Sequence, residues 1–374
     1  MRVLDGAPPY VPEIVHFVYG GERAFSGPDF HGSGVGGTEA GVVVLAEAMA
    51  RRGMRVTVFT PVQAPTLFRG VLYAPTAAGT GETADLLIVV KQWPEPAGAR
   101  RATRTLLWLT DVHVPDHARL RGALSRVDGV LWLSPYQQRR VGAAVREAGL
   151  ARSVVIGEPV DLDDYRDTPA ERGPLMIFCS IPERGLVDLA RWMPAILRRV
   201  PTARLVVTSD YTLWGKPGAR AAFARYLGDD PRVTYAGHVT RGELVRWQRQ
   251  ARVMAYPCRF PEGFCISAAE CMAAGAVPVT TDDFALRTTV GDGGILIRGG
   301  PHRRLTRMVY GWRFVRAVTR LLQDDAHWAR LSAVAQRRAR DTFAPDVVTD
   351  RVLEFAGTLT QCGATGTAGL GKPE

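Results

Sequence analysis

The sequence predicts an α/β protein made of two doubly wound, Rossmann-like domains with a cleft between them. Short apolar segments typical of strands alternate with segments of helical spacing, and the alternation starts a second time near residue 175. The chain has 374 residues, which suits two domains of ordinary size. This alternation favours parallel sheets with right-handed crossovers, whose ligands bind near the carboxyl ends of the strands.

The first domain is expected to extend over residues 1–163. Its predicted strands are residues 13–19, 54–60, 86–90, 105–109 and 130–133. A glycine-rich loop follows the first strand, and the helix after this loop is expected to end at Gly53, because glycine commonly ends helices. Residues 156–164 contain glycine and proline without periodicity, so we place the domain boundary there.

The second domain is expected over residues 164–345. Its predicted strands are residues 175–179, 204–208, 233–235, 253–256 and 277–280, and its predicted helices are residues 186–199, 243–251 and 267–274. A helical region follows from about residue 302. For residues 346–374 we expect a helix that returns to the first domain and then a disordered tail, which is rich in Gly, Thr and Ala.

The composition is that of a globular protein, with 46% hydrophobic and 22% charged residues. No apolar run approaches the roughly 20 residues that span a bilayer, and the five cysteines show no CxxC spacing. We therefore expect a cytoplasmic protein without disulfides or a zinc site. The net charge is +10, but the basic residues are spread along the chain, so we expect no nucleic-acid partner.

Residues 303–320 combine arginines with apolar residues at helical spacing. A basic amphipathic helix can lie on an anionic membrane surface. More often such a helix packs its apolar face against the core and leaves the charged face in water, and we favour this interpretation. Contact with a membrane surface stays open as the less favoured alternative.

The glycine-rich loop is the first candidate ligand-binding segment. It contains Gly32-Ser33-Gly34-Val35-Gly36-Gly37-Thr38-Glu39. Glycines let backbone N–H groups approach an anion, and the start of the following helix adds a favourable potential. The loop lies too far from the strand to fit the dinucleotide-binding fingerprint. We expect Gly36 and Gly37 to approach a phosphate or the substrate, with a flexible surface loop as the alternative.

Two glutamates, Glu262 and Glu270, lie eight residues apart in the second candidate segment. The first is on a loop after a predicted strand, and the second is in the first turns of a predicted helix. The amides of Phe264, Cys265 and Ile266 at this helix start are suited to a diphosphate. Both carboxylates would line the same cleft, and a carboxylate can accept hydrogen bonds from two neighbouring sugar hydroxyls.

A purely structural role is the alternative for Glu270. Ser267-x-x-Glu270 is a capping-box pattern, which stabilises a helix by roughly 1 kcal/mol without any ligand. Glu262 lies between Pro261 and Gly263, where the sequence shows no local partner for its carboxylate. A ligand-binding role is therefore favoured more strongly for Glu262 than for Glu270.

Taken together, these segments resemble the retaining glycosyltransferases of family 4, which have the GT-B fold. The resemblance rests first on the E-x7-E element from Glu262 to Glu270 and the AAGAVPV segment after it. Other matching segments are GGTE at 36–39, IPERGL at 181–186, VTYAGHV at 233–239 and GGILI at 293–297. The resemblance covers about residues 13–345.

The resemblance implies roles for the residues of the second domain. Glu262 would contact the hydroxyls of the transferred sugar, and Glu270 would bind the ribose of the nucleotide. Arg184 would pair with the donor diphosphate and stabilise the departing nucleotide. Gly237 and His238 would flank the nucleobase.

In the first domain, Gly37 would let the loop approach the phosphates, and His113 would be the active-site histidine near the sugar. The alternative for His113 is a histidine whose hydrogen bonds are satisfied by backbone at a strand end. At residues 179–180, Cys-Ser replaces the usual Gly-Arg pair, so one expected phosphate cation is absent, and Lys91 is the candidate replacement. Residues 157–161, Gly-Glu-Pro-Val-Asp, keep only the last two positions of the usual Asn-Gly-Val-Asp.

These implications predict a metal-independent, retaining glycosyltransferase of the hexosyltransferase type. It would move a sugar from a nucleotide-diphosphate donor to an acceptor hydroxyl and need no cofactor. Two alternatives stay open, which are a nucleotide-sugar epimerase of the same fold and a non-catalytic nucleotide-sugar-binding protein. The expected acceptor is a small molecule, a lipid or a glycan.

Overall fold

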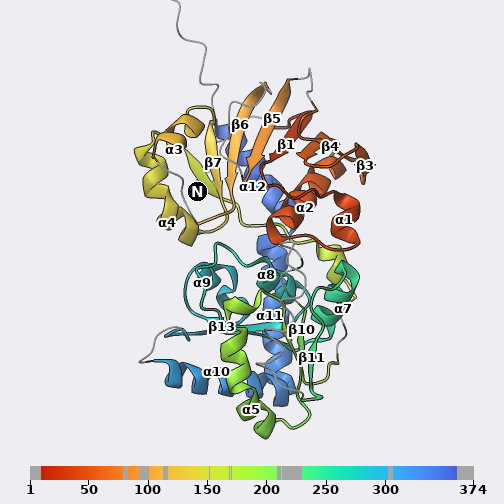
Figure 1. Cartoon of the computed structure of the whole chain (residues 1–374), viewed down its shortest axis with the longest axis vertical. Helices are drawn as coiled ribbons and strands as arrows, with labels where there is room; N and C mark the ends of the chain where they lie inside the picture. Colours follow the sequence, from red (N-terminus) through yellow and green to blue (C-terminus); the bar gives the residue numbers. More distant parts are fainter. Residues whose placement is uncertain are drawn as a thin grey trace, which may run out of the picture.

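The computed structural model describes residues 10–78, 83–91, 101–112, 117–150, 152–167, 169, 171–208, 212, 230–301 and 306–359. Within these residues the chain forms two β-sheets, one from each half of the sequence. The two halves lie one above the other in Figure 1, with the red-to-yellow elements above and the green-to-blue elements below, apart from the blue C-terminal helix, which lies in the upper half.

The first sheet has eight strands in the order β3-β4-β2-β1-β5-β6-β7-β8. They are β1 (Ile14–Tyr19), β2 (Arg55–Thr60), β3 (Thr66–Phe68), β4 (Val71–Pro75), β5 (Ala84–Val90), β6 (Ala102–Leu109), β7 (Gly129–Trp132) and β8 (Ser153–Val155). All neighbours are parallel except β3 and β4. The central strand β1 pairs Val15 with Val56 on one side and Leu86 on the other, and all three side chains are buried.

The second sheet has six strands in the order β11-β10-β9-β12-β13-β14, and its pairs are parallel. They are β9 (Leu175–Phe178), β10 (Arg204–Val207), β11 (Val233–Tyr235), β12 (Val253–Tyr256), β13 (Val277–Thr281) and β14 (Ile295–Ile297). β9, β12 and β13 are almost wholly buried and consist of near-continuous apolar residues. Such runs are expected where helices cover both faces of a parallel sheet.

The described helices connect these strands and follow them at the end of the chain. They are α1 (Gly27–His31), α2 (Gly37–Arg51), α3 (His117–Leu124), α4 (Pro135–Glu147), α5 (Leu186–Arg199), α7 (Arg241–Gln250), α8 (Ile266–Ala273), α9 (Leu286–Thr289), α10 (Arg307–Gln323), α11 (Asp325–Phe343) and α12 (Pro345–Thr358). The last helix, α12, packs against α2 of the first domain. Arg52, at the end of α2, holds α12 against the first domain by donating hydrogen bonds to Asp346 at 3.1 Å and to Asp350 at 2.6 Å.

The predicted fold class of two doubly wound α/β domains is confirmed. Helix α1 and the antiparallel pair β3–β4 were not predicted, because a five-residue helix and a three-residue strand are too short to show a period. Helix α7 begins at Arg241, two residues before the predicted start, because Thr240 and Glu243 form a capping box there. The predicted disordered tail lies outside the described residues.

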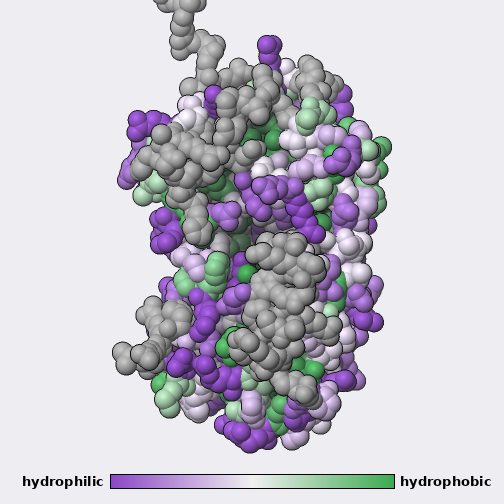
Figure 2. Space-filling model, viewed as in Figure 1, coloured by the Kyte–Doolittle hydropathy of each residue, from purple (hydrophilic) through white to green (hydrophobic). Residues whose placement is uncertain are grey.

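The face shown in Figure 2 carries hydrophilic and hydrophobic side chains interspersed. The basic segment near residue 310 forms α10, which buries Tyr310, Phe314 and Val318 against the core. Met308 and Trp312 of the same helix are exposed, and the Arg316 guanidinium lies over the Trp312 ring. In the described part of the chain, no helix is both long and apolar enough to cross a bilayer.

Candidate functional site

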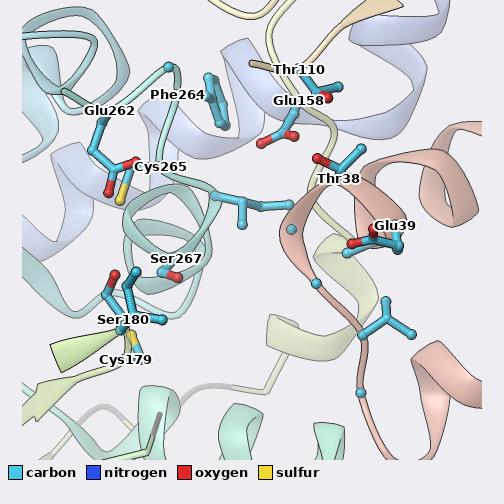
Figure 3. Close-up of a pocket in the computed structure, with 18 of the residues that line it drawn as sticks. Thr38, Glu39, Thr110, Glu158, Cys179, Ser180, Glu262, Phe264, Cys265 and Ser267 are labelled. Atoms are coloured by element: carbon cyan, nitrogen blue, oxygen red, sulfur yellow. The ribbon is translucent and has the colours of Figure 1, made fainter. Parts of the chain in front are cut away.

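A cavity of about 1030 Å³ lies between the two domains, at the carboxyl ends of the central strands. Its first-domain wall comes from the loop after β1, the start of α2 and the loop after β6. Its second-domain wall comes from the loops after β9 and β12 and the start of α8. Figure 3 shows these two walls, with Glu262, Cys265 and Ser180 from the second domain and Thr38, Glu39 and Thr110 from the first. The predicted residues that line the cavity are Gly36, Gly37, Lys91, Arg184, His238, Glu262, Phe264, Cys265, Ile266 and Glu270.

The other two predicted residues are placed differently. Gly237 follows β11 with a positive φ of 68°, and its N–H donates to the Val207 carbonyl at 3.2 Å, next to His238 at the cavity wall. His113 lies outside the described residues, so its place near the sugar stays a prediction.

Glu262 is buried and held in a two-point ion pair with Arg184. The Arg184 Nη1 donates to both Glu262 carboxylate oxygens at 2.9 Å, and the Tyr256 hydroxyl donates to Oε1. The sequence showed no local partner for the Glu262 carboxylate, and the structure supplies two, Arg184 from a distant segment and Tyr256 from six residues earlier. Arg184 is 78 residues away in the sequence, so only folding brings the pair together. Burial alone would lower the pKa of the Arg184 guanidinium, but the charge of Glu262 together with the neighbouring Tyr256, Cys258 and Cys265 groups raises that pKa.

The backbone at Gly185 positions Arg184. Gly185 has φ 147°, and a Cβ there would lie 2.3 Å from the Pro257 carbonyl oxygen, so the position requires glycine. The Arg184 carbonyl accepts from the Arg259 N–H at 3.2 Å, and the Phe260 ring lies 4.8 Å from the Arg184 guanidinium carbon. The Arg184 Nε is buried without a hydrogen-bond partner among the described residues. One edge of this guanidinium is thus bound to Glu262 and another is unsatisfied.

Glu270 is buried in a second ion pair, with Arg241 of α7. The Arg241 Nη1 lies 2.5 Å from Glu270 Oε1, and the Gln248 Nε2 donates to Glu270 Oε2 at 3.2 Å. Helix α8 starts at Ile266 with Cys265 as its N-cap, so Ser267 is already inside the helix. The capping-box alternative for Glu270 is therefore wrong, because a capping box needs Ser267 at the N-cap.

Arg241 also connects the two domains. It donates to Asp164 Oδ2 from Nε at 2.9 Å and from Nη2 at 2.7 Å, and its backbone N–H donates to the Gly32 carbonyl at 3.0 Å. Its guanidinium carbon lies 4.9 Å from the centre of the Phe30 ring. Gly32 and Phe30 belong to the first domain, so the partner of Glu270 also fixes the position of the glycine loop.

Two helix N-termini border the cavity, those of α2 and α8. A Cβ added at Gly37, the first residue of α2, would lie 3.0 Å from Cγ2 of Ile266, the first residue of α8. A Cβ at Gly36 would lie 2.3 Å from Glu39 Oε2. The first amides of a helix have no intrahelical acceptor and carry a partial positive charge. The arrangement is therefore suited to a multiply charged anion, such as a diphosphate.

Lys91 lines the cavity from the end of β5. Its Nζ lies 3.5 Å from Glu39 Oε1 and 3.5 Å from the Tyr19 hydroxyl, which itself donates to Glu39. Burial and the adjacent Glu39 charge raise the pKa of Tyr19, so this hydroxyl stays protonated. The Lys91 charge is shared with Glu39, and its contact with a phosphate stays a prediction.

Glu158 is a cavity residue that the sequence analysis did not assign to the site. Its side chain is buried, and Thr38 and Thr110 line the same cavity (Figure 3). The available signal was the departure from the family pattern at residues 157–161, where a carboxylate replaces a residue that carries no charge.

Two parallel-sheet α/β domains with a cavity between them define the GT-B class of fold. Residues 174–331 match the protein-family model described as Glycosyl transferases group 1. No curated protein matches the chain in sequence.

Solved glycosyltransferase structures of the GT-B fold are similar to this chain. Sucrose-phosphate synthase from Thermosynechococcus elongatus aligns with a TM-score of 0.66 and 18% identity over 91% of this chain and 97% of its own. Anabaena HepE in complex with UDP and glucose aligns with a TM-score of 0.65 and 16% identity, over 93% of this chain and 100% of its own. The catalytic domain of starch synthase IV from Arabidopsis thaliana, bound to ADP and acarbose, aligns with a TM-score of 0.65 and 12% identity, over 94% of this chain and 99% of its own. At these identities the similarity shows the shared fold.

Proposed function

We propose that the protein is a cytoplasmic glycosyltransferase that uses a nucleoside diphosphate sugar as donor. One observation carries the proposal, which is that Arg184, Glu262 and the N-termini of α2 and α8 face one cavity between two GT-B domains. The match of the second domain to the group 1 family model supports it. The neighbours solved with UDP and glucose or with ADP and acarbose support a nucleotide donor for this fold.

The diphosphate of the donor binds Arg184 and the start of α8 in this proposal. Arg184 has an unsatisfied Nε, and a guanidinium can pair two phosphate oxygens at once. The Ile266 end of α8 adds amides and a favourable dipole. Arg184 thus holds the Glu262 carboxylate in one orientation while its other edge receives the phosphates.

The two glutamates bind hydroxyl groups of the donor. Glu262 accepts from hydroxyls of the sugar, and Glu270 accepts from the ribose. Both are already paired with arginine, but a carboxylate has about four acceptor positions, so the existing bonds leave room for more. The ion pairs hold each carboxylate in one orientation before the donor arrives, which lowers the entropic cost of binding.

Transfer breaks the bond between the sugar anomeric carbon and the diphosphate oxygen and forms a bond from that carbon to the acceptor oxygen. The acceptor proton passes to the departing phosphate, so atoms and charge balance without an enzymic base, and the new bond forms on the face that the phosphate leaves. Arg184 and the start of α8 stabilise the negative charge that develops on the phosphate, a role that requires no metal ion. The proposed enzyme is therefore retaining and metal-independent.

Thermal-shift titration with UDP, ADP, GDP and the matching glucose donors tests the proposal, because a ligand of the folded state raises the melting temperature. At least one diphosphate is expected to stabilise the chain, and its sugar conjugate is expected to be hydrolysed or transferred in EDTA. Tight donor binding without either reaction would indicate a binding protein, and interconversion of the sugar would indicate an epimerase. No stabilisation by any of these compounds would contradict the proposal.

A further inference from the structure

Glu158 differs from three other glutamates that line the cavity, because no cation among the described residues pairs with its carboxylate. These three glutamates each form an ion pair: Glu39 with Lys91 at 3.5 Å, Glu262 with Arg184 at 2.9 Å and Glu270 with Arg241 at 2.5 Å. The side chain of Glu158 is 95% buried, since only 5% of the residue is exposed. No hydrogen bond or ion pair reaches its carboxylate from the residues that the structure describes.

The position of Glu158 aims this unpaired group at the cavity. It lies on the segment that joins the domains, beside α2, where a Cβ added at Gly41 would lie 3.7 Å from Glu158 Oε1. Figure 3 draws Glu158, Thr38 and Thr110 in the same part of the view, with Glu262 on the other wall, and all four residues line the cavity. Glycine at position 41 leaves the space that the carboxylate occupies.

Thr110 provides a second, independent unsatisfied group at the same place. Its Oγ1 is buried and has no hydrogen-bond partner among the described residues. Thr110 and Thr38 both line the cavity. A buried polar group without a partner destabilises the fold, typically by 1–3 kcal/mol, so the unsatisfied Thr110 hydroxyl, in the cavity that Glu158 also lines, indicates a missing ligand.

The charges around Glu158 decide its protonation state. Burial and the charges of Glu39, Glu262 and Glu270 raise the pKa of Glu158 to about 8. These three glutamates face it from α2, from the loop after β12 and from α8, and the cations on the same walls are held by them. Glu158 is therefore a neutral acid at pH 7, with an O–H that can donate and a carbonyl that can accept.

We propose that Glu158, Thr110 and Thr38 form the subsite that binds the acceptor, and that this subsite takes a neutral hydroxyl-bearing saccharide. The inference rests on the proposed glycosyltransferase function, which places the diphosphate on the cations of the opposite wall. A neutral acid beside two threonine hydroxyls both donates to and accepts from a sugar hydroxyl. An anionic acceptor would instead meet three carboxylates, Glu39, Glu262 and Glu270, whose cations are already paired with them.

Titration of the full-length chain with glucose and maltose tests the subsite, in the presence of the nucleoside diphosphate that stabilises it most. Glu158→Ala and Thr110→Val are each expected to weaken saccharide binding about tenfold, because each removes a hydrogen-bonding group. Glu158→Gln, which keeps a donor and an acceptor, is expected to stay within about twofold of wild type. Thr280→Val is the matched control, since the Thr280 hydroxyl is also buried and unpartnered but does not line the cavity.

The outcomes separate this inference from the proposed function. If the wild-type chain binds no nucleoside diphosphate, the proposed glycosyltransferase function is overturned. Intact diphosphate binding with no saccharide binding, or with equal saccharide affinity in wild type, Glu158→Ala and Thr110→Val, would overturn the subsite alone. Infrared difference spectra give a readout that does not depend on activity. A carboxylic-acid band at pH 7 that Glu158→Gln removes is expected, and its absence would contradict the neutral acid.

Discussion

Arg184 binds both carboxylate oxygens of Glu262 from one nitrogen, at 2.9 Å each, inside the interdomain cavity. The two residues come from different loops of the second domain, after β9 and after β12. The pair joins the residue expected at the diphosphate to the residue expected at the sugar. A donor that binds here meets a cation and a carboxylate that already orient each other.

Arg184→Ala is expected to weaken binding of a nucleoside diphosphate by about tenfold to a hundredfold, because a charge-assisted hydrogen bond contributes roughly 1.5–3 kcal/mol. Binding of the corresponding nucleoside should change little, since it carries no phosphate. Isothermal titration of both ligands measures the difference. Arg313→Ala, on the exposed side of α10, is the control for loss of one positive charge. Equal diphosphate affinity in Arg184→Ala and Arg313→Ala would contradict the assignment.

Glu262→Ala is expected to abolish most turnover and also to lower the free energy of unfolding, by roughly 1–3 kcal/mol. The stability loss follows because the substitution leaves the buried Arg184 guanidinium and the Tyr256 hydroxyl without their acceptor. Tyr256→Phe removes only the hydrogen bond from the Tyr256 hydroxyl to Glu262, so it should lower the free energy of unfolding by less. Denaturant unfolding of the two variants measures this. A Glu262→Ala chain as stable as wild type would show that the ion pair does not stabilise the fold.

Arg241→Ala is expected to be among the most destabilising single substitutions, at roughly 3–5 kcal/mol. It leaves Glu270 buried without a cation and removes both bonds to Asp164. Arg246→Ala, exposed on the same helix, should change stability by less than about 0.5 kcal/mol. Melting temperatures of the two variants at pH 7 provide the comparison. Similar melting temperatures would mean that the ion pairs of Arg241 with Glu270 and Asp164 contribute little to the stability of the fold.

Glu158 predicts a pH dependence of stability. Its pKa is raised from the ordinary 4.5 to about 8 in the folded chain. Between these values the unfolded chain releases the proton and the folded chain keeps it, so the unfolded state binds fewer protons. Stability therefore falls as pH rises from about 4.5 to 8 and levels off above, by roughly 1.4 kcal/mol for each unit between the two pKa values.

Glu158→Gln cannot ionise, so this loss should disappear in the variant. Unfolding free energies of wild type and Glu158→Gln at pH 5, 7 and 9 measure the effect. The variant is expected to gain stability relative to wild type as pH rises. A constant difference between the two chains at all three pH values would show that Glu158 does not titrate in this range.

The strands and helices that build the two domains followed from the sequence because they are long or strongly apolar. β9 and β12 appear as continuous apolar runs, and α5 has clear helical spacing. Short elements such as α1 and β3 carry no comparable signal. Most of the candidate site residues also came from the sequence, because the E-x7-E element and the glycine loop lie on contiguous segments.

The partners of those residues could not be predicted, because the two arginines lie on distant segments and Tyr256 lies on the preceding strand, outside any local capping pattern. Glu262 showed no local partner in the sequence, yet Arg184 and Tyr256 bind it. Ser267 and Glu270 have capping-box spacing, yet α8 begins earlier and Arg241 takes the carboxylate. Local spacing reports only on hydrogen bonds within a few residues, whereas these pairs span from 6 to 78 positions.

The sequence by itself determined two alternating α/β halves, the loop and helix starts that border the cavity, and which acidic residues belong to one segment. Only the tertiary structure decided which cation each glutamate receives. Glu158 shows the difference most clearly, because its pKa depends on burial and on three carboxylates from separate elements. Charge and solvation depend on distance in space, and folding sets that distance.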